Sequence, residues 1–455
     1  MAGLFRQTRS GHCRLLDPGA GIGSLSSAFL ERCQADDLIF SGIEVTAIEL
    51  DSLLHEDLDR TLAGYTSRLR LNFEIVGGDF VEQAVNRIQF GQTLFTHAIL
   101  NPPYKKIGSD SRYRLLLRGV GIETVNLYSA FVALTLALMA PGGQVVAIIP
   151  RSCCNGPYYR PFRDFMLKQA AIHHMHLFDS RRKAFKDDSV LQENIILLLE
   201  RGTPQGDVTV STSTDDTFDD LESHTHPFDR IVLPDDTEQF IHVPTTTGHN
   251  AIELSAAITH SLVDIGVSVS TGPVVDFRLK EHLRDMPAQG TVPLLYPAHF
   301  KGMTTEWPQP GMKKPNAIMR NAETEKWLYP QGYYCVVRRF SAKEEKRRVI
   351  AGVVRPGAFG NATVLGFENH LNLFHEHKQG LPETLALGLA VYLNTSAVDE
   401  NFRRFNGHTQ VNATDLRLMK YPSREALIAL GEWAIDKGTE LTQAMIDEQF
   451  IKLTP

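Results

Sequence analysis

Long apolar runs are absent from this sequence of 455 residues. The longest, from Ser129 to Ala140, is too short to cross a bilayer. The N-terminus also lacks a charged region followed by an apolar one, which a secretory signal requires. We therefore expect neither export nor insertion into a membrane.

Cysteine is scarce as well. The five cysteines form neither a CxxC pair nor an even framework of spacings. This pattern predicts free thiols in a reducing compartment, and the cytoplasm is the expected location. The histidines within 173–176 and 370–377 lack carboxylate or thiolate partners at ligand spacing, so we predict no metal site.

Positive charge is in deficit overall, because the net charge is −7, and this argues weakly against a nucleic-acid partner. The deficit is uneven along the chain. Between Lys301 and Arg355 there are twelve Lys and Arg residues but only five Asp and Glu residues. A DNA-facing surface is therefore expected in the C-terminal half.

The length and the order of apolar segments predict two domains. In residues 1–205 short apolar strands alternate with helical stretches, which is typical of an α/β domain with a mostly parallel sheet. Residues 206–250 are polar and acidic, so we expect a linker with edge strands there, and residues 251–455 favour an α+β domain. The strands expected in the first domain are Cys13 to Leu16, Ile43 to Ile48, Phe73 to Val76, His97 to Leu100, Gln144 to Ile149, Ile172 to Phe178 and Asn194 to Leu199.

A glycine-rich loop follows the first expected strand. Its glycines, Gly19, Gly21 and Gly23, let the backbone turn sharply beneath a ligand, where a Cβ would clash. A dinucleotide-binding loop would read GxGxxG, whereas this loop reads GxGxG with Asp17 two positions ahead of it. The variant favours a cofactor without a pyrophosphate, and a glycine-rich turn without a ligand is the alternative.

Acidic residues also end the next two expected strands. Glu49 can accept both hydrogen bonds of a ribose diol. Asp79 offers an acceptor for an adenine amino group, and Phe80 offers a ring for the π face of the base. A solvated glutamate at a strand end is common, but the spacing from Asp17 favours a cofactor site.

The fourth expected strand runs into Asn101, Pro102, Pro103 and Tyr104. Two prolines remove two backbone donors, so the loop presents acceptors. An exocyclic amine is a poor nucleophile because its lone pair is delocalised into the aromatic ring. The Asn101 side chain and the Pro102 carbonyl can draw the amine protons and push the nitrogen towards tetrahedral geometry, while Tyr104 stacks on the base.

In this order, the motifs DPGAGIG, IEL, GDF and NPPY resemble those of the gamma-type N6-adenine DNA methyltransferases of type II restriction-modification systems, the family of the Eco57I and TaqI methylases. The resemblance implies the class I S-adenosylmethionine-dependent methyltransferase fold, a Rossmann-like seven-stranded sheet whose last strand is antiparallel, followed by a target-recognition domain. It also implies S-adenosyl-L-methionine as cofactor and methylation of an adenine flipped out of double-stranded DNA.

The resemblance assigns roles to single residues. Asp17 and the glycine loop would hold the methionine part of the cofactor, Glu49 its ribose, and Asp79 with Phe80 its adenine. Phe185 is the candidate for an aromatic ring that a late motif of the family places against the flipped base.

Two motifs of the second domain predict DNA contacts. An aromatic strand that runs into an expected basic helix offers side chains for phosphates or guanine edges: Arg338, Arg339, Lys346, Arg347 and Arg348. A polar loop offers His408 and Gln410 before a helix that Asn412 or Thr414 could cap. A solvated basic face and an ordinary loop are the alternatives.

We therefore expect a site-specific adenine methylase that protects host DNA from a cognate restriction endonuclease. An RNA or protein-glutamine methyltransferase is an alternative, since any planar amine or amide poses the same problem. A cytosine-N4 methylase is a closer rival, although its loop more often begins with Ser than with Asn101. The family's Thr-Pro segment upstream of the glycine loop has no room here, so a truncated, catalytically impaired DNA-binding subunit is the last alternative.

Overall fold

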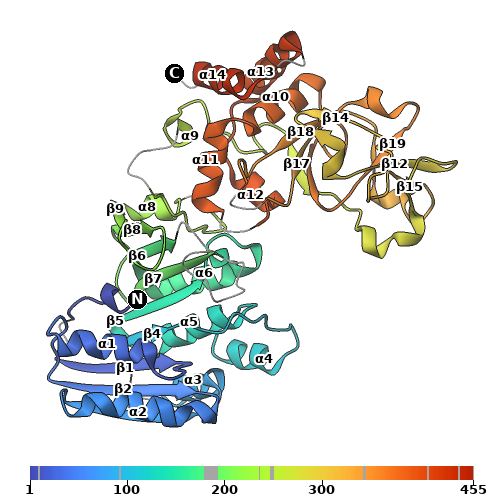
Figure 1. Cartoon of the computed structure of the whole chain (residues 1–455). Coiled ribbons are helices and arrows are strands. Elements are labelled where there is room, and N and C mark those ends of the chain that lie inside the picture. The colour runs from blue at the N-terminus through green and yellow to red at the C-terminus, as the bar shows by residue number, and fades with distance from the viewer. Residues whose placement is uncertain are drawn as a thin grey trace. The chain divides into compact units, whose positions relative to one another are not determined.

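The computed structural model describes residues 1–8, 11–91, 94–178, 193–234, 236–245, 251–341, 345–406, 409–438 and 441–453. Contacts divide the chain into two compact units, Met1–Thr247 and Gly248–Pro455 (Figure 1). Each unit has its own sheets and its own core.

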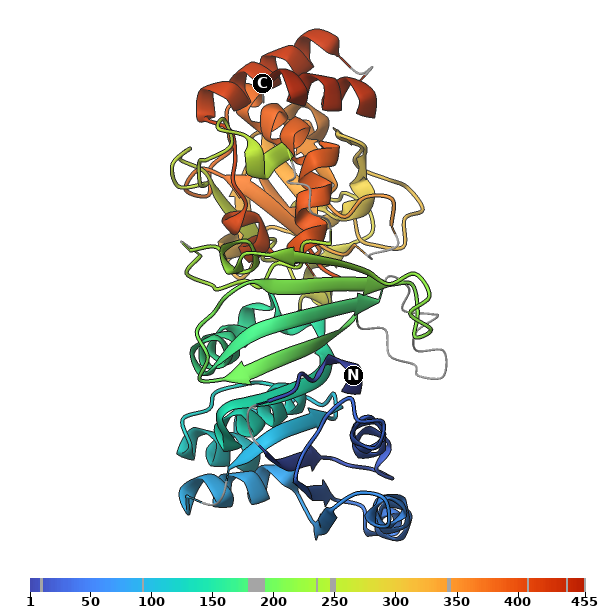
Figure 2. The same ribbon diagram turned by 90° about the vertical axis from the view of Figure 1, so that its left-hand side faces the viewer.

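The first unit is built on a nine-stranded sheet with the order β3-β2-β1-β4-β5-β7-β6-β8-β9. The strands are β1 (His12–Pro18), β2 (Gly42–Glu49), β3 (Leu71–Gly77), β4 (Phe95–Leu100), β5 (Met139–Pro150), β6 (Ala170–Phe178), β7 (Asn194–Arg201), β8 (Val208–Ser213) and β9 (Glu222–His226). Strands β1 to β5 pair in parallel, whereas β7 runs antiparallel to both β5 and β6. Figure 2 shows this sheet passing from the blue strands to the green strands β8 and β9.

This sheet confirms the fold expected from the sequence. Each of the seven predicted strands lies inside an observed one, and the seventh is the antiparallel strand β7. Strand β8 pairs in parallel with β6, and β9 pairs antiparallel with β8. Residues 206–250, where we expect a linker with edge strands, thus add two strands to the sheet.

Helices cover both faces of the sheet. On one face, α1 (Ser24–Gln34) and α2 (His55–Thr66) pack on a core that includes Leu15. On the other face, α3 (Phe80–Gln89), α5 (Leu127–Leu138) and α6 (Arg160–Gln169) pack on a core that includes Leu16. Leu15 and Leu16 are neighbours in β1 but belong to different cores, because successive side chains of a strand point to opposite faces.

The fold brings the predicted cofactor and catalytic motifs to one edge of the sheet. Strands β1 to β4 are parallel, so their carboxyl ends meet there. Asp17 and the glycine loop lie at the end of β1, Glu49 ends β2, Asp79 follows β3, and Asn101 follows β4. Ligands of open α/β sheets bind outside the carboxyl ends of the strands.

The second unit is α+β, as expected. It has a four-stranded sheet of order β10-β20-β17-β18, a five-stranded sheet of order β11-β15-β12-β19-β16, and the hairpin β13-β14. The strands are β10 (Ser268–Thr271), β11 (Leu283–Arg284), β12 (Thr291–Leu295), β13 (Phe300–Lys301), β14 (Thr304–Thr305), β15 (Ala317–Met319), β16 (Leu328–Pro330), β17 (Tyr334–Arg338), β18 (Ala351–Val354), β19 (Val364–Phe367) and β20 (Leu371–His375). Its longer helices are α10 (Glu383–Leu393), α11 (Ser396–Phe405), α12 (Ala413–Leu418), α13 (Arg424–Lys437) and α14 (Gln443–Leu453).

The basic helix expected after β17 is wrong for the residues described there, 345–350, which form no helix. The reason is a side-chain acceptor: the Asp399 carboxylate accepts the backbone N–H groups of Arg348 (2.6 Å) and Val349 (3.0 Å). The predicted cap of the later helix is confirmed. Asn412 precedes α12, and its backbone N–H donates to Asp415 Oδ2 at 2.8 Å.

Helices α10 and α13 cross at two glycines. A Cβ at Gly388 would lie 1.7 Å from the carbonyl oxygen of Leu427, and one at Gly431 would lie 1.7 Å from that of Thr384. Each glycine therefore allows the facing backbone to approach more closely than any side chain permits.

Replacing either glycine by alanine should separate the two helices. We expect Gly388→Ala to destabilise the second unit by roughly 3 kcal/mol, because the facing carbonyl is backbone and cannot turn away. Thermal unfolding and hydrogen exchange of α10 and α13 would measure the loss. Gly64→Ala is the matched control, since that glycine lies in α2 with no atom in reach of a Cβ, and it should be neutral or stabilising. Equal melting temperatures for Gly388→Ala and the parent chain would contradict the close crossing.

Candidate active site

Asp17 is the most buried charged group of the candidate site. Its side chain is 1% exposed, and its Oδ2 accepts a hydrogen bond from the Ser26 hydroxyl at 2.6 Å. Its Oδ1 is buried and has no hydrogen-bond partner in the described part of the chain. Burial raises the pKa of this carboxyl to about 6. The site thus holds one acceptor that a bound donor could satisfy.

The glycine loop is tied to the end of β2. Its three glycines have φ angles of +76° (Gly19), +58° (Gly21) and +86° (Gly23), which only glycine adopts at little cost. The backbone N–H of Gly19 donates to the Ile48 carbonyl at 2.8 Å, and that of Gly21 donates to Glu49 Oε2 at 2.7 Å. The loop and the Glu49 carboxylate therefore form one unit.

Glu49 is held on both sides. Its Oε2 accepts the Gly21 N–H, and its Oε1 accepts the Asp51 N–H at 2.9 Å. The residue is 9% exposed. Each carboxylate oxygen can accept a second hydrogen bond, so the group stays able to receive a diol.

Asp79 and Phe80 begin α3. Asp79 Oδ1 caps the helix by accepting the N–H groups of Val81 (2.8 Å) and Glu82 (3.2 Å). Its Oδ2 accepts the hydroxyl of Tyr113 at 2.5 Å. Phe80 is 3% exposed and packs against Phe131, with 4.7 Å between ring centroids. The ring expected to face an adenine is thus almost completely covered in this structure.

The loop after β4 presents a polar surface. Asn101 and Pro103 are exposed, Pro102 is buried, and Tyr104 is half-buried. The Asn101 side chain makes no hydrogen bond to any described residue, so its amide oxygen is available. The rings of Tyr104 and Tyr128 lie nearly perpendicular to each other, with 6.0 Å between centroids.

Sequence reasoning missed three aromatic or hydroxyl groups at this edge. Tyr113 and Ser26 bind the two predicted aspartates, and Tyr159 stacks on Tyr128 behind Tyr104, with centroids 5.6 Å apart. The contacts of Tyr113 and Tyr159 join residues more than 30 positions apart, and Ser26 lies nine positions after Asp17, so no motif marks any of the three. Phe185 lies outside the described residues. Phe178, at the end of β6 just before them, is buried against His176.

In the second unit, the two predicted DNA motifs meet. Residues Arg339 to Ser341 pair with residues Thr409 to Val411 through two backbone hydrogen bonds of 2.7 and 3.0 Å. The Arg339 guanidinium donates to Gln410 Oε1 at 3.3 Å and to the Asn369 carbonyl at 3.2 Å. Arg338 forms an ion pair with Glu345. His408 lies outside the described residues.

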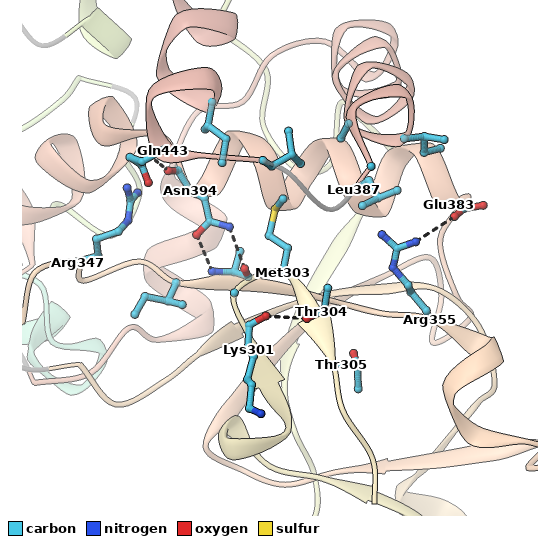
Figure 3. Close-up of a pocket in the computed structure, with 18 of the residues that line it drawn as sticks. Lys301, Met303, Thr304, Thr305, Arg347, Arg355, Glu383, Leu387, Asn394 and Gln443 are labelled. Carbon is cyan, nitrogen blue, oxygen red and sulfur yellow. Dashed lines mark hydrogen bonds and ion pairs between the residues drawn. The ribbon is translucent and has the colours of Figure 1, made fainter. Parts of the chain in front are cut away.

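The other basic candidates differ in access. Lys346 is exposed, and Arg347 donates to the Thr395 carbonyl at 2.8 Å. Both line a cavity of about 1160 Å³ together with Lys301 and Arg355; Figure 3 shows Arg347 near Asn394 and Gln443, with Arg355 and its partner Glu383 across the cavity. Arg348 is 2% exposed and donates to Asn406 Oδ1 at 2.7 Å, so its burial removes it from the DNA-contact candidates.

One group of possible metal ligands, Glu281, His282 and Glu323, is found among the described residues. Both carboxylates are exposed, and His282 lies 3.0 Å from Glu323. Two histidines from the group dismissed in the sequence, His174 and His176, hydrogen-bond to a serine of β8 instead of forming a ligand set. We assign no metal to any of them.

The sheet, with its antiparallel seventh strand and the glycine loop beside Asp17, defines a class I S-adenosylmethionine-dependent methyltransferase. Residues 56–185 match the family described as Eco57I restriction-modification methylase. The whole chain is 53% identical to type II methyltransferase M.BsuBI of Bacillus subtilis and covers 91% of it. Over 98% of the chain it is 41% identical to type II methyltransferase M.PstI of Providencia stuartii, covering 89% of that protein. The chain therefore belongs to the type II methyltransferases of restriction-modification systems, and its methyl donor is S-adenosylmethionine.

Two more distant similarities are informative. Over 40% of the chain it is 27% identical to a tRNA1(Val) (adenine(37)-N6)-methyltransferase of Shewanella woodyi, covering 76% of that protein. The structure of the type IIL restriction-modification enzyme MmeI with DNA matches 97% of this chain and 68% of that chain, with a TM-score of 0.51 and 10% identity. The latter likeness shows a shared fold.

The burial of Asp17 predicts that a neutral residue in its place stabilises the free protein. Burial raises the pKa of this carboxyl to about 6, so at pH 8 it is still ionised. The folded, cofactor-free protein then carries a buried charge. A carboxyl whose pKa is raised on folding stabilises the protein fully only below its pKa in the unfolded chain, roughly 3.9. This contribution to the free energy of unfolding is lost as the pH rises through about 6. Asp17→Asn should therefore raise the melting temperature at pH 8, by the equivalent of about 3 kcal/mol, and less at pH 5.5.

Scanning calorimetry of the free protein at both pH values would measure this difference. Asp59→Asn is the control, because Asp59 is exposed on α2, and it should change nothing. A melting temperature for Asp17→Asn that is equal to or below that of the parent chain at pH 8 would contradict an uncompensated buried charge.

Proposed function

We propose that this chain is a site-specific DNA methyltransferase that methylates the N6 amine of an adenine flipped out of double-stranded DNA. The observation that carries the proposal is the loop from Asn101 to Tyr104. It follows β4 directly, beside the ends of the three strands with the acidic groups of the site, and exposes an amide oxygen that no described residue engages.

The acidic groups fit the polar parts of S-adenosylmethionine. The unpartnered Oδ1 of Asp17 would accept the ammonium of the methionine part, and Glu49 would accept the ribose diol. Asp79 Oδ2 would accept the adenine amino group. The Phe80 ring would reach the base only if its packing against Phe131 opens. Gly19, Gly21 and Gly23 leave the loop without side chains, so its backbone can approach a ligand closely. When bound, the cofactor supplies a methyl group on a positively charged sulfur.

The catalytic loop would activate the amine by accepting its hydrogens. The Asn101 side chain and the Pro102 carbonyl would each accept one N–H, which turns the nitrogen lone pair away from the base plane and towards the methyl group. Neither group is a strong base, and none is needed, because the nitrogen becomes acidic enough to release a proton once it is alkylated. Positioning therefore provides most of the effect.

Tyr104 would stack on the extruded base. Flipping a nucleotide costs a few kcal/mol, and stacking on an aromatic ring returns roughly 1 to 3 kcal/mol per base. The ring has a fixed edge contact with Tyr128, which in turn stacks on Tyr159, so it is positioned before any base arrives. Phe185 remains the proposed second ring.

Adenine is favoured over cytosine by Asn101 and by the tRNA methyltransferase relative, whose name specifies adenine N6. That relative also keeps RNA as the competing substrate. Its similarity spans 197 residues, which cannot include both units, whereas the type II relatives match essentially the whole chain. This difference favours DNA, with the second unit as the target-recognition domain.

In the second unit, we propose that the joined motifs contact DNA. Arg338, Arg339 and Gln410 would face base edges or phosphates, together with His408, and Lys346 and Arg347 would contact phosphates from the rim of the cavity. A restriction endonuclease that cuts the same sequence would be the functional partner, and the cytoplasm, where host DNA lies, the location. In the described chain no helix is long and apolar enough to span a membrane.

Asn101→Ala tests the chemistry. Expressed in a methylation-deficient bacterial host, the parent chain should place N6-methyladenine at one recurring DNA motif, mapped by long-read sequencing. The variant should lower the methylation rate by roughly 100-fold or more, because a transition-state hydrogen bond is lost, without changing cofactor affinity. Asn72→Ala, at an exposed position of β3, is the control and should methylate normally.

Other modifications would identify the alternatives. N4-methylcytosine in place of N6-methyladenine would replace the adenine assignment, and methylated RNA with unmodified DNA would move the substrate to RNA. If the chain binds the cofactor but modifies neither DNA nor RNA, the remaining alternative is a non-catalytic DNA-binding protein.

The DNA-contact proposal predicts two different binding defects. Gln410→Ala should weaken binding to the cognate duplex by 1 to 3 kcal/mol (roughly 5- to 150-fold) and spare non-cognate DNA, as expected for a base contact. Lys346→Gln should weaken binding to both duplexes and lower the slope of log affinity against log salt by about 1. Lys280→Gln, an exposed change outside both motifs, is the control. If all three variants bind both duplexes as tightly as the parent chain, this surface does not contact DNA.

A further inference from the structure

Residues 105–126 form a closed excursion between the catalytic loop and α5. The chain leaves directly after Tyr104 and returns to the same place: the Ile107 N–H donates to the Val125 carbonyl at 2.9 Å, and the Leu127 N–H donates to the Lys105 carbonyl at 2.8 Å. The excursion carries α4 (Arg112–Gly119). None of the motifs recognised in the sequence lies in it.

Helix α4 contacts the start of α3 at two points. The Tyr113 hydroxyl donates to Asp79 Oδ2 at 2.5 Å, and Arg112 forms an ion pair with Glu82 at 3.0 Å. The hydrogen bond to Asp79 raises the pKa of Tyr113 to about 12, so the hydroxyl is protonated and acts as a donor at neutral pH.

The two oxygens of Asp79 are not equivalent. Oδ1 is engaged in capping α3, where it accepts the N–H groups of Val81 and Glu82. Oδ2 is therefore the oxygen left for a ligand, and one of its two acceptor positions is taken by Tyr113. Any amino group that reaches this carboxylate must bind beside the Tyr113 hydroxyl.

We propose that Tyr113 is a positioning and specificity-determining residue for the adenine ring of the cofactor. Its hydroxyl and the adenine amino group donate to the same oxygen, Asp79 Oδ2. Tyr113 fixes the direction of the remaining acceptor position, so the pocket accepts a 6-amino purine and rejects a 6-oxo purine, whose carbonyl would face the carboxylate. The proposal rests on the role given above to Asp79.

Calorimetry with the full chain tests this pairing. The probes are S-adenosylhomocysteine and S-inosylhomocysteine, which differ in having an amino or an oxo group at position 6 of the purine and in the hydrogen that the oxo form carries on N1. Tyr113→Phe should weaken the adenosyl ligand by roughly 10-fold and leave the inosyl ligand nearly unchanged, so the discrimination between them falls. A purely structural role would weaken both ligands equally.

Two control variants separate the hydroxyl from its helix. Arg112→Gln removes the ion pair between α4 and α3 but leaves Asp79 untouched, and it should keep the discrimination. Tyr158→Phe, at a tyrosine that is 74% exposed, should change neither affinity nor melting temperature.

Two results would overturn the role of Tyr113. Unchanged discrimination in Tyr113→Phe, or tighter binding of the adenosyl ligand, would overturn the proposal, and the latter would show that the hydroxyl competes with the amino group. Asp79→Asn distinguishes the role of Tyr113 from that of Asp79. Loss of discrimination in Asp79→Asn but not in Tyr113→Phe would reject Tyr113 alone, whereas full affinity and discrimination in Asp79→Asn would reject the assigned role of Asp79.

Discussion

The carboxylate of Asp17 is kept out of water at the end of the interior strand β1, and the candidate site is organised around it. One oxygen is satisfied by Ser26, while the other has no partner in the described chain. Burial of an incompletely paired charge costs stability, which the raised pKa expresses. The protein keeps this unfavourable group where a cationic ligand would offset it, and the loop with Gly21 is tied to Glu49 around the same position.

The two halves of the candidate site divide between acidic groups and neutral acceptors. The ends of β1 to β3 carry carboxylates, which suit the ammonium, diol and amino groups of a small cofactor. The end of β4 carries an amide and carbonyls, which suit an amine that must stay neutral until it reacts. Acceptors of the two kinds lie at the ends of neighbouring strands of one sheet.

Much of the first unit follows from the sequence because its signals are local. A short run of residues is enough to predict each of the seven strands, the loop with Asp17 and the turn at Asn101. Contacts between distant residues were not predictable: Tyr113 reaches Asp79 from 34 positions away, and Arg348 is buried because Asp399 and Asn406 bind it. The same long-range contacts replaced the basic helix expected after β17. Phe80 is in the predicted place, but its packing against Phe131 could not be read from its motif.

Strand order also bears on how the first unit forms during synthesis. Strand β7 lies between β5 and β6, although both precede it in the chain. Until residues 194–201 have been made, β5 and β6 cannot be joined, and each presents an unpaired, apolar edge open to other chains. A nascent chain that stops before β7 therefore holds the sheet β3-β2-β1-β4-β5 and a single unpaired strand, β6, and completion of β7 joins the two.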